Sequence, residues 1–299
     1  MESVLCMPAN KPRIKPVAWV TGGSQGIGRS IADALACAGY TVIISARTKK
    51  DVETAAAEIS SGGSICEGIV LDVTDSSTVQ SAVQFILSKH QRIDLLVCCA
   101  GIYGPIGPLE GNDAAQWQQA LSINVAGTML CVRAALPVMK KQKKGCILTI
   151  AGGGVGGPRI KPNFSSYVSS KFAICGFTEA LSAELAGSGV RINAISPGAV
   201  NTRLLQQVLA SGDKAGKDFL SASLKQKETG GTPPKLAAEL VLYLASDAGA
   251  HLSGKVLSAV WDPPNKLEQR KGRGAGQISS SLYTLRRIDE ELFGEMKKK

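Results

Sequence analysis

A glycine-rich turn near the amino terminus constrains the fold more than any other feature of the sequence. The apolar run Val17–Thr21 leads directly into GGSQGIG (residues 22–28), and a helical pattern follows. Such a turn needs glycines because the chain bends tightly, the backbone must approach a phosphate without a Cβ in the way, and the helix must pack closely on the strand. Free N–H groups at the start of the helix then face the phosphates. The turn predicts a pyrophosphate-binding site, and a turn without a ligand is the alternative.

Short β-branched runs alternate with longer helical patterns along most of the chain. This alternation produces βαβ crossovers and a parallel sheet that is covered on both faces. The sequence therefore predicts one α/β domain, doubly wound, with a seven-stranded parallel sheet. The expected strands are Val17–Thr21, Thr41–Ser45, Ile65–Leu71, Leu95–Cys99, Cys146–Ile150, Val190–Ser196 and Val256–Val260. The expected helices are Ile27–Ala38, Lys50–Ser60, Ser76–Lys89, Gln116–Lys140, Tyr167–Leu185 and Pro234–Ser246.

The predicted domain spans residues 14–264, with an amino-terminal arm (1–13) before it and a basic extension (265–299) after it. Two segments interrupt the alternation, 151–163 and 201–231, and both follow strands at the edge where open α/β sheets bind ligands. The extension holds nine Lys or Arg and five Asp or Glu, which indicates a solvated tail or a weak anion- or partner-binding arm. Helical spacing within it predicts docking on the domain or on a neighbouring subunit, through Leu282, Leu285, Ile288, Leu292 and Phe293.

Charge, hydropathy and cysteine content exclude several classes of function. The net charge is +10, but the basic residues are not clustered with an element that reads bases, so no nucleic-acid partner is expected. No apolar run approaches the ~18 residues of a membrane span, and the amino terminus lacks the apolar core of a secretory signal. The eight cysteines form no CxxC pair. We expect buried, reduced thiols in a cytoplasmic protein, without a metal site or a membrane partner.

Tyr167 and Lys171 stand four residues apart in a helical pattern, so both project from the same face of the helix. Together with the glycine turn, this pair resembles the short-chain dehydrogenase/reductase family. Further similar segments are Asp72-Val73 at the end of the third strand, RIDLLVCCAG (92–101), SINV around Asn124, and SPGAVNT (196–202). The resemblance covers about residues 14–264.

Membership of this family implies a Rossmann-like fold and an NAD(P)-dependent oxidoreductase that interconverts a ketone and a secondary alcohol. Tyr167 is the expected general acid/base. Lys171 and the positive ring of the oxidised cofactor are together expected to lower its pKa, and Lys171 is also expected to bind the nicotinamide ribose. Asn124 is expected to hold a water that relays protons to the lysine. The usual assembly is a homodimer or homotetramer. The residues expected to contact the cofactor are Gly22, Ser24, Gln25, Gly26, Ile27, Gly28, Arg47, Asp72, Val73, Ala100, Gly101, Tyr167, Lys171, Pro197, Gly198, Val200 and Thr202.

The end of the second strand bears on the choice between the two nicotinamide cofactors. A carboxylate at this place binds the ribose 2′-hydroxyl of NAD, whereas a cation suits the 2′-phosphate of NADP. Ala46 occupies the expected position of the acid, and Arg47 and Thr48 follow it. An arginine fork matches a phosphate. NADP(H) is therefore favoured over NAD(H), and an exposed arginine at a helix start is the alternative.

The sequence departs from the family at the catalytic serine that hydrogen-bonds the substrate carbonyl. Counting back from Tyr167 gives Gly154, and matching the end of the fifth strand gives Gly152. Ser165 and Ser166 are too close to Tyr167 to fill the position unless a loop folds one of them back. Either backbone N–H groups of the triple glycine bind the carbonyl oxygen, or the protein binds NADP(H) without turnover as a regulatory or scaffold protein. We expect a working enzyme.

The substrate is expected to lie over the nicotinamide, between loops 102–113, 151–163 and 201–231. The last of these is predicted to be a mobile amphipathic lid carrying Leu204, Leu205, Val208, Leu209, Phe219 and Leu220. A mostly apolar small-molecule ketone or alcohol is expected. The candidate substrate contacts are Gly152, Gly153, Gly154, Phe164, Tyr103 and Trp261. Cys98 and Cys99 replace two family asparagines that brace the sheet, and a redox-active cysteine pair is the alternative.

Overall fold

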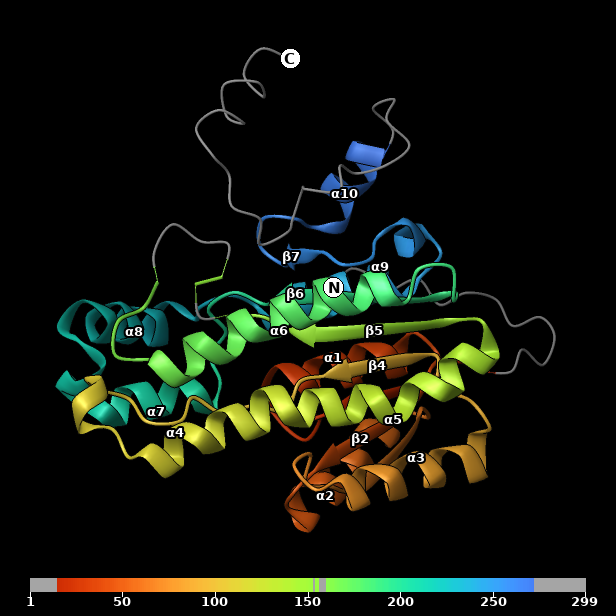
Figure 1. The fold of residues 1–299 in the computed structure, drawn as a ribbon, viewed down its shortest axis with the longest axis horizontal. Coiled ribbons are helices and arrows are strands. Elements are labelled where there is room, and N and C mark those ends of the chain that lie inside the picture. Colours follow the sequence, from red (N-terminus) through yellow and green to blue (C-terminus); the bar gives the residue numbers. More distant parts are fainter. Residues whose placement is uncertain (1–14, 153, 156–159, 272–299) are drawn as a thin grey trace.

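Seven parallel strands form a single sheet in the order β3-β2-β1-β4-β5-β6-β7. A computed structural model describes residues 15–152, 154–155 and 160–271 of the chain. The sheet runs through the centre of the molecule, and the predicted seven-stranded parallel architecture is confirmed (Figure 1). The strands are β1 (Val17–Thr21), β2 (Thr41–Ala46), β3 (Ile65–Val70), β4 (Leu95–Cys98), β5 (Gly145–Ile150), β6 (Val190–Ser196) and β7 (Val256–Ser258).

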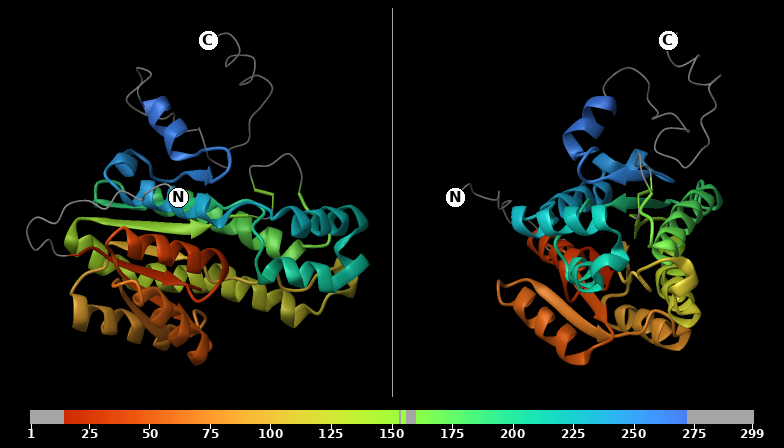
Figure 2. Two further views of the ribbon diagram at one scale, coloured as in Figure 1. Left: turned by 180° about the vertical axis from the view of Figure 1, so that it is seen from behind. Right: turned by 90° about the vertical axis from the view of Figure 1, so that its left-hand side faces the viewer.

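Helices cover both faces of the sheet, as two further views show (Figure 2). One layer contains α1 (Gly26–Cys37), α2 (Lys49–Ser60) and α9 (Pro234–Ala245), and the other contains α3 (Ser76–His90), α5 (Gly127–Gln142) and α6 (Ser165–Glu184). The predicted lid segment 201–231 forms two helices, α7 (Arg203–Ser211) and α8 (Lys217–Thr229). These lie beyond the carboxyl ends of the strands, at the left of Figure 1.

Alternate residues of each strand enter two separate apolar layers. In β1, Ala18 and Val20 pack with α1 and α9, whereas Val17 and Trp19 pack with α3 and α5. Strands that are buried on both faces need apolar residues at every position, which explains the continuous apolar runs in the sequence. The register pairs Val17 with Thr41 and Ala18 with Leu95, so the carboxyl ends of the strands meet at one edge.

One helical run is longer than the sequence indicates. The predicted helix Gln116–Lys140 is part of α4 (Ala114–Leu121), a π-helical turn (Ser122–Ala126) and α5, which continue one another. Its most apolar stretch has a mean hydropathy of 1.5, which by length and composition alone is high enough for a membrane span, so the expectation that no run approaches this length was wrong. In this structure 44% of that stretch is buried within the domain.

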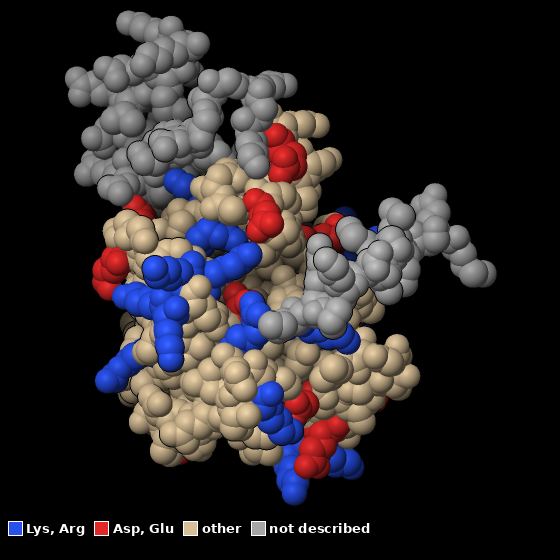
Figure 3. Space-filling view, turned by 90° about the vertical axis from the view of Figure 1, so that its right-hand side faces the viewer, with Lys and Arg blue, Asp and Glu red and all other residues tan. Residues whose placement is uncertain are grey.

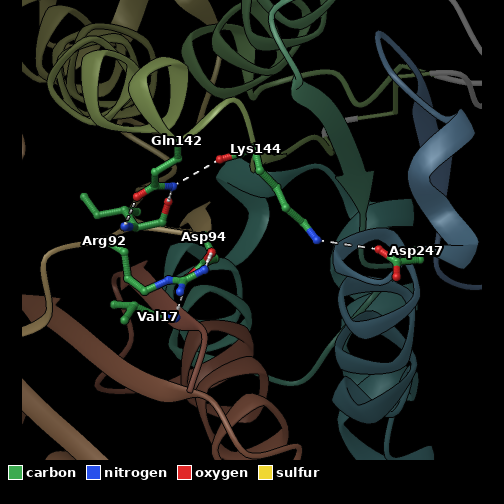
Figure 4. Close-up of polar contacts among 7 residues, drawn as sticks. Val17, Arg92, Asp94, Gln142, Lys144 and Asp247 are labelled. Carbon is green, nitrogen blue, oxygen red and sulfur yellow. Dashed lines mark hydrogen bonds and ion pairs between the residues drawn. The ribbon is translucent and has the colours of Figure 1, made fainter. Parts of the chain in front are cut away.

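Polar contacts close the amino ends of the central strands (Figure 4). The Asp94 carboxylate accepts hydrogen bonds from the Val17 backbone N–H (2.8 Å) and from Arg92 (2.6 and 2.7 Å). Gln142 joins α5 to this end through the Ile93 backbone, and Lys144 pairs with Asp247 at 3.7 Å. These contacts leave the opposite, carboxyl edge as the place where ligands can enter.

Basic side chains gather on this amino-end side, which lies at the right of Figure 1 and faces the viewer in Figure 3. Lys140, Lys141, Lys143 and Lys144 are all exposed there, at the end of α5 and the start of β5. The cluster lies at the end of the sheet opposite the glycine turn, so it takes no part in the candidate site described below.

The predicted extension begins inside a helix that packs on the domain. Helix α10 (Pro264–Lys271) contacts α9, and its Leu267 is fully buried among the residues of the α1–α9 layer. The predicted docking residues Leu282–Phe293 lie outside the described residues.

Trp19 is the largest fully buried side chain and lies in the middle of β1. Replacing it with alanine leaves a cavity that the surrounding strands cannot fill, so Trp19→Ala is expected to lower the free energy of unfolding by about 3–5 kcal/mol in urea denaturation. Trp261 is 60% exposed, and Trp261→Ala is the matched control, with an expected change within about 0.5 kcal/mol. Equal effects of the two variants would contradict the buried placement of Trp19.

Candidate active site

The glycine turn adopts the geometry that the sequence predicts. Gly22 has a φ of +66°, in the left-handed region that favours glycine, and its N–H donates to the Ser45 carbonyl at 2.8 Å. A Cβ on Gly28 would overlap the Gly22 carbonyl oxygen, so only glycine lets α1 start this close to the turn. Gln25, the residue before α1, makes no side-chain capping bond. The first N–H groups of the helix are therefore free to face an anion.

A continuous groove runs from this turn along the carboxyl edge of the sheet. The groove consists of three adjoining pockets: one at the adenosine end, one along the glycine turn and one beside Tyr167. Gly101 lines all three, so they form one surface. All the residues expected to contact the cofactor line it, and their arrangement fits an extended dinucleotide. At one end lie Gly22, Ser24, Gln25, Arg47, Asp72, Val73 and Ala100; in the middle lie Gly26, Ile27 and Gly28; at the other end lie Tyr167, Lys171, Pro197, Gly198, Val200 and Thr202.

The adenosine end of the groove contains charged residues of both signs. Arg47 is exposed, and no ion pair of the described residues includes it. Asp51, in the first turn of α2, lines the same section, as does Arg203 at the start of α7. The sequence reasoning missed Asp51 and Arg203, although a basic residue directly after Thr202 was a usable signal. The Asp72 carboxylate is held by the Thr74 backbone N–H and hydroxyl at 2.9 and 2.7 Å.

Tyr167 and Lys171 lie one turn apart on α6, where the groove opens into a cavity. A Cβ built on Gly152 would lie 3.0 Å from the Tyr167 Oη, so the tyrosine hydroxyl lies directly over the end of β5. Lys171 is only 6% exposed, and its Nζ donates to the Ile150 carbonyl oxygen at 2.8 Å. The Lys171 Nζ is 5.4 Å from the centre of the Tyr167 ring.

In the free protein, the pKa of Tyr167 lies above its ordinary value. Burial raises the pKa of Tyr167 well above its usual value, and the neighbouring Tyr103 and Cys99 raise it further. In the free protein the phenol is packed against Tyr103 and the ammonium is bonded to a backbone carbonyl. The expectation that Lys171 and the bound oxidised cofactor together lower this pKa stays a prediction. Burial also lowers the pKa of Lys171, to about 8. Burial thus shifts both groups toward their neutral forms, although a lysine with a pKa of about 8 still carries its charge at neutral pH.

Asn124 lies beneath the groove rather than on its surface. It is 1% exposed and sits in the π-helical turn between α4 and α5. Its side chain accepts from the Ile102 N–H and donates to the Ile102 carbonyl and to the Ser170 hydroxyl, all at 2.9 Å. The predicted water relay remains a prediction. The bonds themselves show a bracing role, since they join the segment after β4 to the helix that carries Tyr167 and Lys171.

The structure places glycines, not serines, beside Tyr167 at the end of β5. Gly152 faces the Tyr167 Oη, and Gly154 also lines the cavity, whereas Gly153 lies outside the described residues. Ser165 accepts from the Trp117 indole at 3.1 Å, and Ser166 donates to the Tyr103 carbonyl at 3.1 Å. Neither serine lines the cavity, so the suggestion that one of them folds back into the site is wrong.

Cys98 and Cys99 contact different layers of the core. Cys98 packs with the α3–α5 layer and Cys99 with the α1–α9 layer, because successive residues alternate across the sheet. Burial raises the pKa of both thiols, that of Cys99 to about 11. Thiols that stay protonated and point apart do not suit redox exchange, which argues against the redox-active pair.

The cavity beside Tyr167 has a volume of about 420 Å³. Of the predicted wall residues, Tyr103, Trp261, Leu204, Leu205, Val208 and Phe219 line it, whereas Leu209 and Leu220 do not. Phe164, expected to contact the substrate, is fully buried behind the wall because it packs edge-to-face between Tyr103 and Phe219. Lys161 and Ser223 are among the polar lining residues that were not predicted.

This arrangement, a dinucleotide groove that ends at a buried tyrosine–lysine pair beside an apolar cavity, defines a nicotinamide-dependent oxidoreductase. The sequence profile of the family described as short chain dehydrogenase matches residues 16–212. The chain belongs to the short-chain dehydrogenase/reductase family, and it is an NAD(P)-dependent dehydrogenase/reductase.

Known relatives extend over most of the chain. The Mus musculus protein named dehydrogenase/reductase SDR family member 4 is 32% identical over 256 residues, which cover 86% of this chain and 90% of that protein. An NAD⁺-bound xylitol dehydrogenase has a TM-score of 0.75 and 27% identity, covering 82% of this chain and 98% of its own. A variant of the actinorhodin polyketide ketoreductase with NADPH has a TM-score of 0.75 and 26% identity, covering 82% and 95%. These neighbours carry different nicotinamide cofactors, so they do not decide the preference of this chain.

The lowered pKa of Lys171 makes stability depend on pH in a defined window. Between about pH 8 and the ordinary lysine value of 10.5, the unfolded chain binds more protons at this residue than the folded one. The free energy of unfolding is therefore expected to rise with pH in this range relative to that of Lys171→Met, as measured by urea denaturation at several pH values. Lys140→Met, at an exposed site on α5, is the control and should follow the wild type. Parallel curves for wild type and Lys171→Met would show that Lys171 is not buried.

Proposed function

We propose that this protein reduces a ketone to a secondary alcohol, or performs the reverse oxidation, with Tyr167 as the proton donor and acceptor and NADP(H) as the preferred cofactor. The observation that carries the proposal is the position of the Tyr167 Oη, over Gly152 at the junction of the groove and the cavity. A carbonyl placed there lies beside the nicotinamide end of the groove and within reach of the phenol.

The nicotinamide, when bound, supplies or accepts the hydride at the carbonyl carbon. In reduction, the Tyr167 Oη gives its proton to the carbonyl oxygen as the C–O double bond becomes an alcohol. The raised pKa of Tyr167 keeps the phenol protonated in the free protein, which suits a proton donor. Lys171, held at the Ile150 carbonyl, stands ready to stabilise the phenolate that forms. Backbone N–H groups at Gly152 and Gly154 take the place of the missing serine at the edge of the cavity.

Removing the phenolic hydroxyl tests this assignment. Tyr167→Phe keeps the ring and its packing, and its kcat/KM is expected to fall by about 10²- to 10⁴-fold, with little change in cofactor affinity. The readout is the absorbance of reduced nicotinamide across a panel of ketones and alcohols. Tyr40→Phe, at a partly buried tyrosine that does not line the groove, is the matched control. Activity that survives Tyr167→Phe would overturn the mechanism. Cofactor binding without turnover of any substrate by the wild type would favour the alternative, a regulatory or scaffold protein that binds NADP(H).

The preference for NADP(H) rests on Arg47, an exposed guanidinium without an ion-pair partner among the described residues at the adenosine end of the groove. A guanidinium binds a 2′-phosphate through a charge-assisted bidentate contact. Asp51 is the opposing feature, because a carboxylate there suits a free 2′-hydroxyl. Asp51 lies in the first turn of α2, whereas Arg47 directly follows β2, where the family reads the ribose.

The variant Arg47→Gln tests whether the protein prefers NADPH to NADH. Its affinity for NADPH is expected to fall by about ten- to hundredfold, as for the loss of a hydrogen bond to a charged group, while its affinity for NADH stays nearly unchanged. Fluorescence titration with each reduced cofactor measures both values. Arg133→Gln, at an exposed arginine of α5, is the control. Tighter binding of NADH than of NADPH by the wild type would contradict the proposed preference for NADP(H).

We also propose that the protein is a cytoplasmic homodimer or homotetramer. The location is supported by the described cysteines, none of which is in a disulfide. The assembly is supported by the apolar character of the α4–α5 run, since more than half of its most apolar stretch stays unburied in the single chain.

A further inference from the structure

A lysine lines the cavity at a place that the proposed chemistry does not use. Lys161 lies just before α6, and its Nζ is 4.3 Å from the centre of the Phe219 ring of α8. This cation–π contact fixes the ammonium at the cavity wall. No ion pair within residues 15–152, 154–155 and 160–271 includes Lys161. The ammonium therefore faces the cavity without a counter-charge from the described chain.

A row of aromatic rings separates this lysine from the catalytic tyrosine. Tyr167 and Tyr103 have ring centres 4.5 Å apart, Tyr103 and Phe164 are 5.3 Å apart, and Phe164 and Phe219 are 5.0 Å apart. Lys161 follows at the end of this row. Tyr167 and Lys161 thus mark two different ends of one apolar wall.

The charge within the cavity has a single sign. Among the described lining residues, the charged side chains are Lys161 and Lys171, and none is Asp or Glu. Lys171 already bonds the Ile150 carbonyl, whereas Lys161 has no such acceptor among the described residues. Burial lowers the pKa of Lys161, which shows that its ammonium has lost hydration without gaining a compensating anion. A negatively charged ligand group would supply that compensation.

A second polar group faces the same part of the cavity. Ser223 is 2% exposed and lines the cavity four residues after Phe219, on the same face of α8. No described residue makes a hydrogen bond with its side chain. Gln226, the next residue on that face, is by contrast bonded to Ala199 and Asn201 at 2.9 Å. Ser223 therefore offers a free donor beside the ring on which Lys161 rests.

We propose that the substrate carries a carboxylate at the end remote from the reacting carbonyl, and that Lys161 binds it with Ser223 as a second donor. The inference rests on the proposed function, because it places the carbonyl at Tyr167. It assigns a substrate class: keto acids, or the matching hydroxy acids, in which an apolar chain separates the two functional groups. Tyr103 and Phe219, the two rings between Tyr167 and Lys161 that line the cavity, offer apolar contacts to this chain, and the 420 Å³ cavity admits a molecule of moderate size.

The test compares keto acids of increasing chain length, with the ketone and the carboxylate at opposite ends, with their own methyl esters. Each ester keeps the reacting ketone and removes the charge. For the best chain length, the wild type is expected to favour the acid over its ester in kcat/KM, and Lys161→Gln to reduce this preference by about ten- to hundredfold. Lys161→Arg should retain most of the preference, and Ser223→Ala should reduce it less. Lys225→Gln, at an exposed lysine of α8, is the control.

Binding is measured separately from turnover, by calorimetric titration of the same acids and esters into the protein with NADPH. Binding of an acid that depends on Lys161, without turnover of any ketone, would support the inference and refute the proposed function. Turnover of neutral ketones, with equal kcat/KM for each acid and its ester, would support the proposed function and refute the inference. A similar loss with acid and ester in Lys161→Gln, together with a lower melting temperature, would show that the lysine only supports α8 and would overturn the inference. Failure of every acid to bind would also overturn it.

Discussion

The site depends on a single buried ammonium group that is held by a backbone carbonyl. Lys171 lies almost completely out of solvent, and its bond to the Ile150 oxygen joins α6 to the last residue of β5. Because this contact fixes the rotation of α6, it also fixes Tyr167 one turn earlier, with its hydroxyl over Gly152. Burying an unpaired charge costs free energy, so the surrounding structure must hold the lysine in this position. Asn124 contributes by tying the segment after β4 to Ser170, the residue next to the lysine.

Much of this framework follows from local sequence patterns. Apolar runs with sharp ends predict the strands well, and β6 matches its predicted span Val190–Ser196 in full. The glycine turn and the tyrosine–lysine spacing are equally local, because one depends on backbone clearance and the other on helical periodicity. The π-helical turn at Ser122–Ala126 was not predicted, since hydrophobic periodicity continues through it unchanged. Lys161 and Ser223 were missed because only the tertiary fold brings α8 over the entry to α6.

The raised pKa of Tyr167 in the free protein likewise depends on the tertiary fold. A sequence shows that a lysine lies one turn away, and this favours a lowered pKa. It does not show how completely Tyr103 and the buried Phe164 exclude water from the phenol. In the folded protein the exclusion of water dominates, and the pKa rises. The glycines in place of the family serine can be read from the sequence, but only the structure shows that Gly152, with a φ of +152° and close to the tyrosine hydroxyl, is a strained place for any side chain.

The burial of Leu267 shows that the folded domain extends past its predicted end at residue 264 and includes α10. Its side chain completes the layer formed by α1 and α9, which includes the helix that starts at the phosphate-binding turn. A chimera joined directly after β7 would therefore expose part of that layer and loosen the support of the turn. In an exchange of carboxyl-terminal segments, a junction beyond α10 keeps Leu267 in this layer.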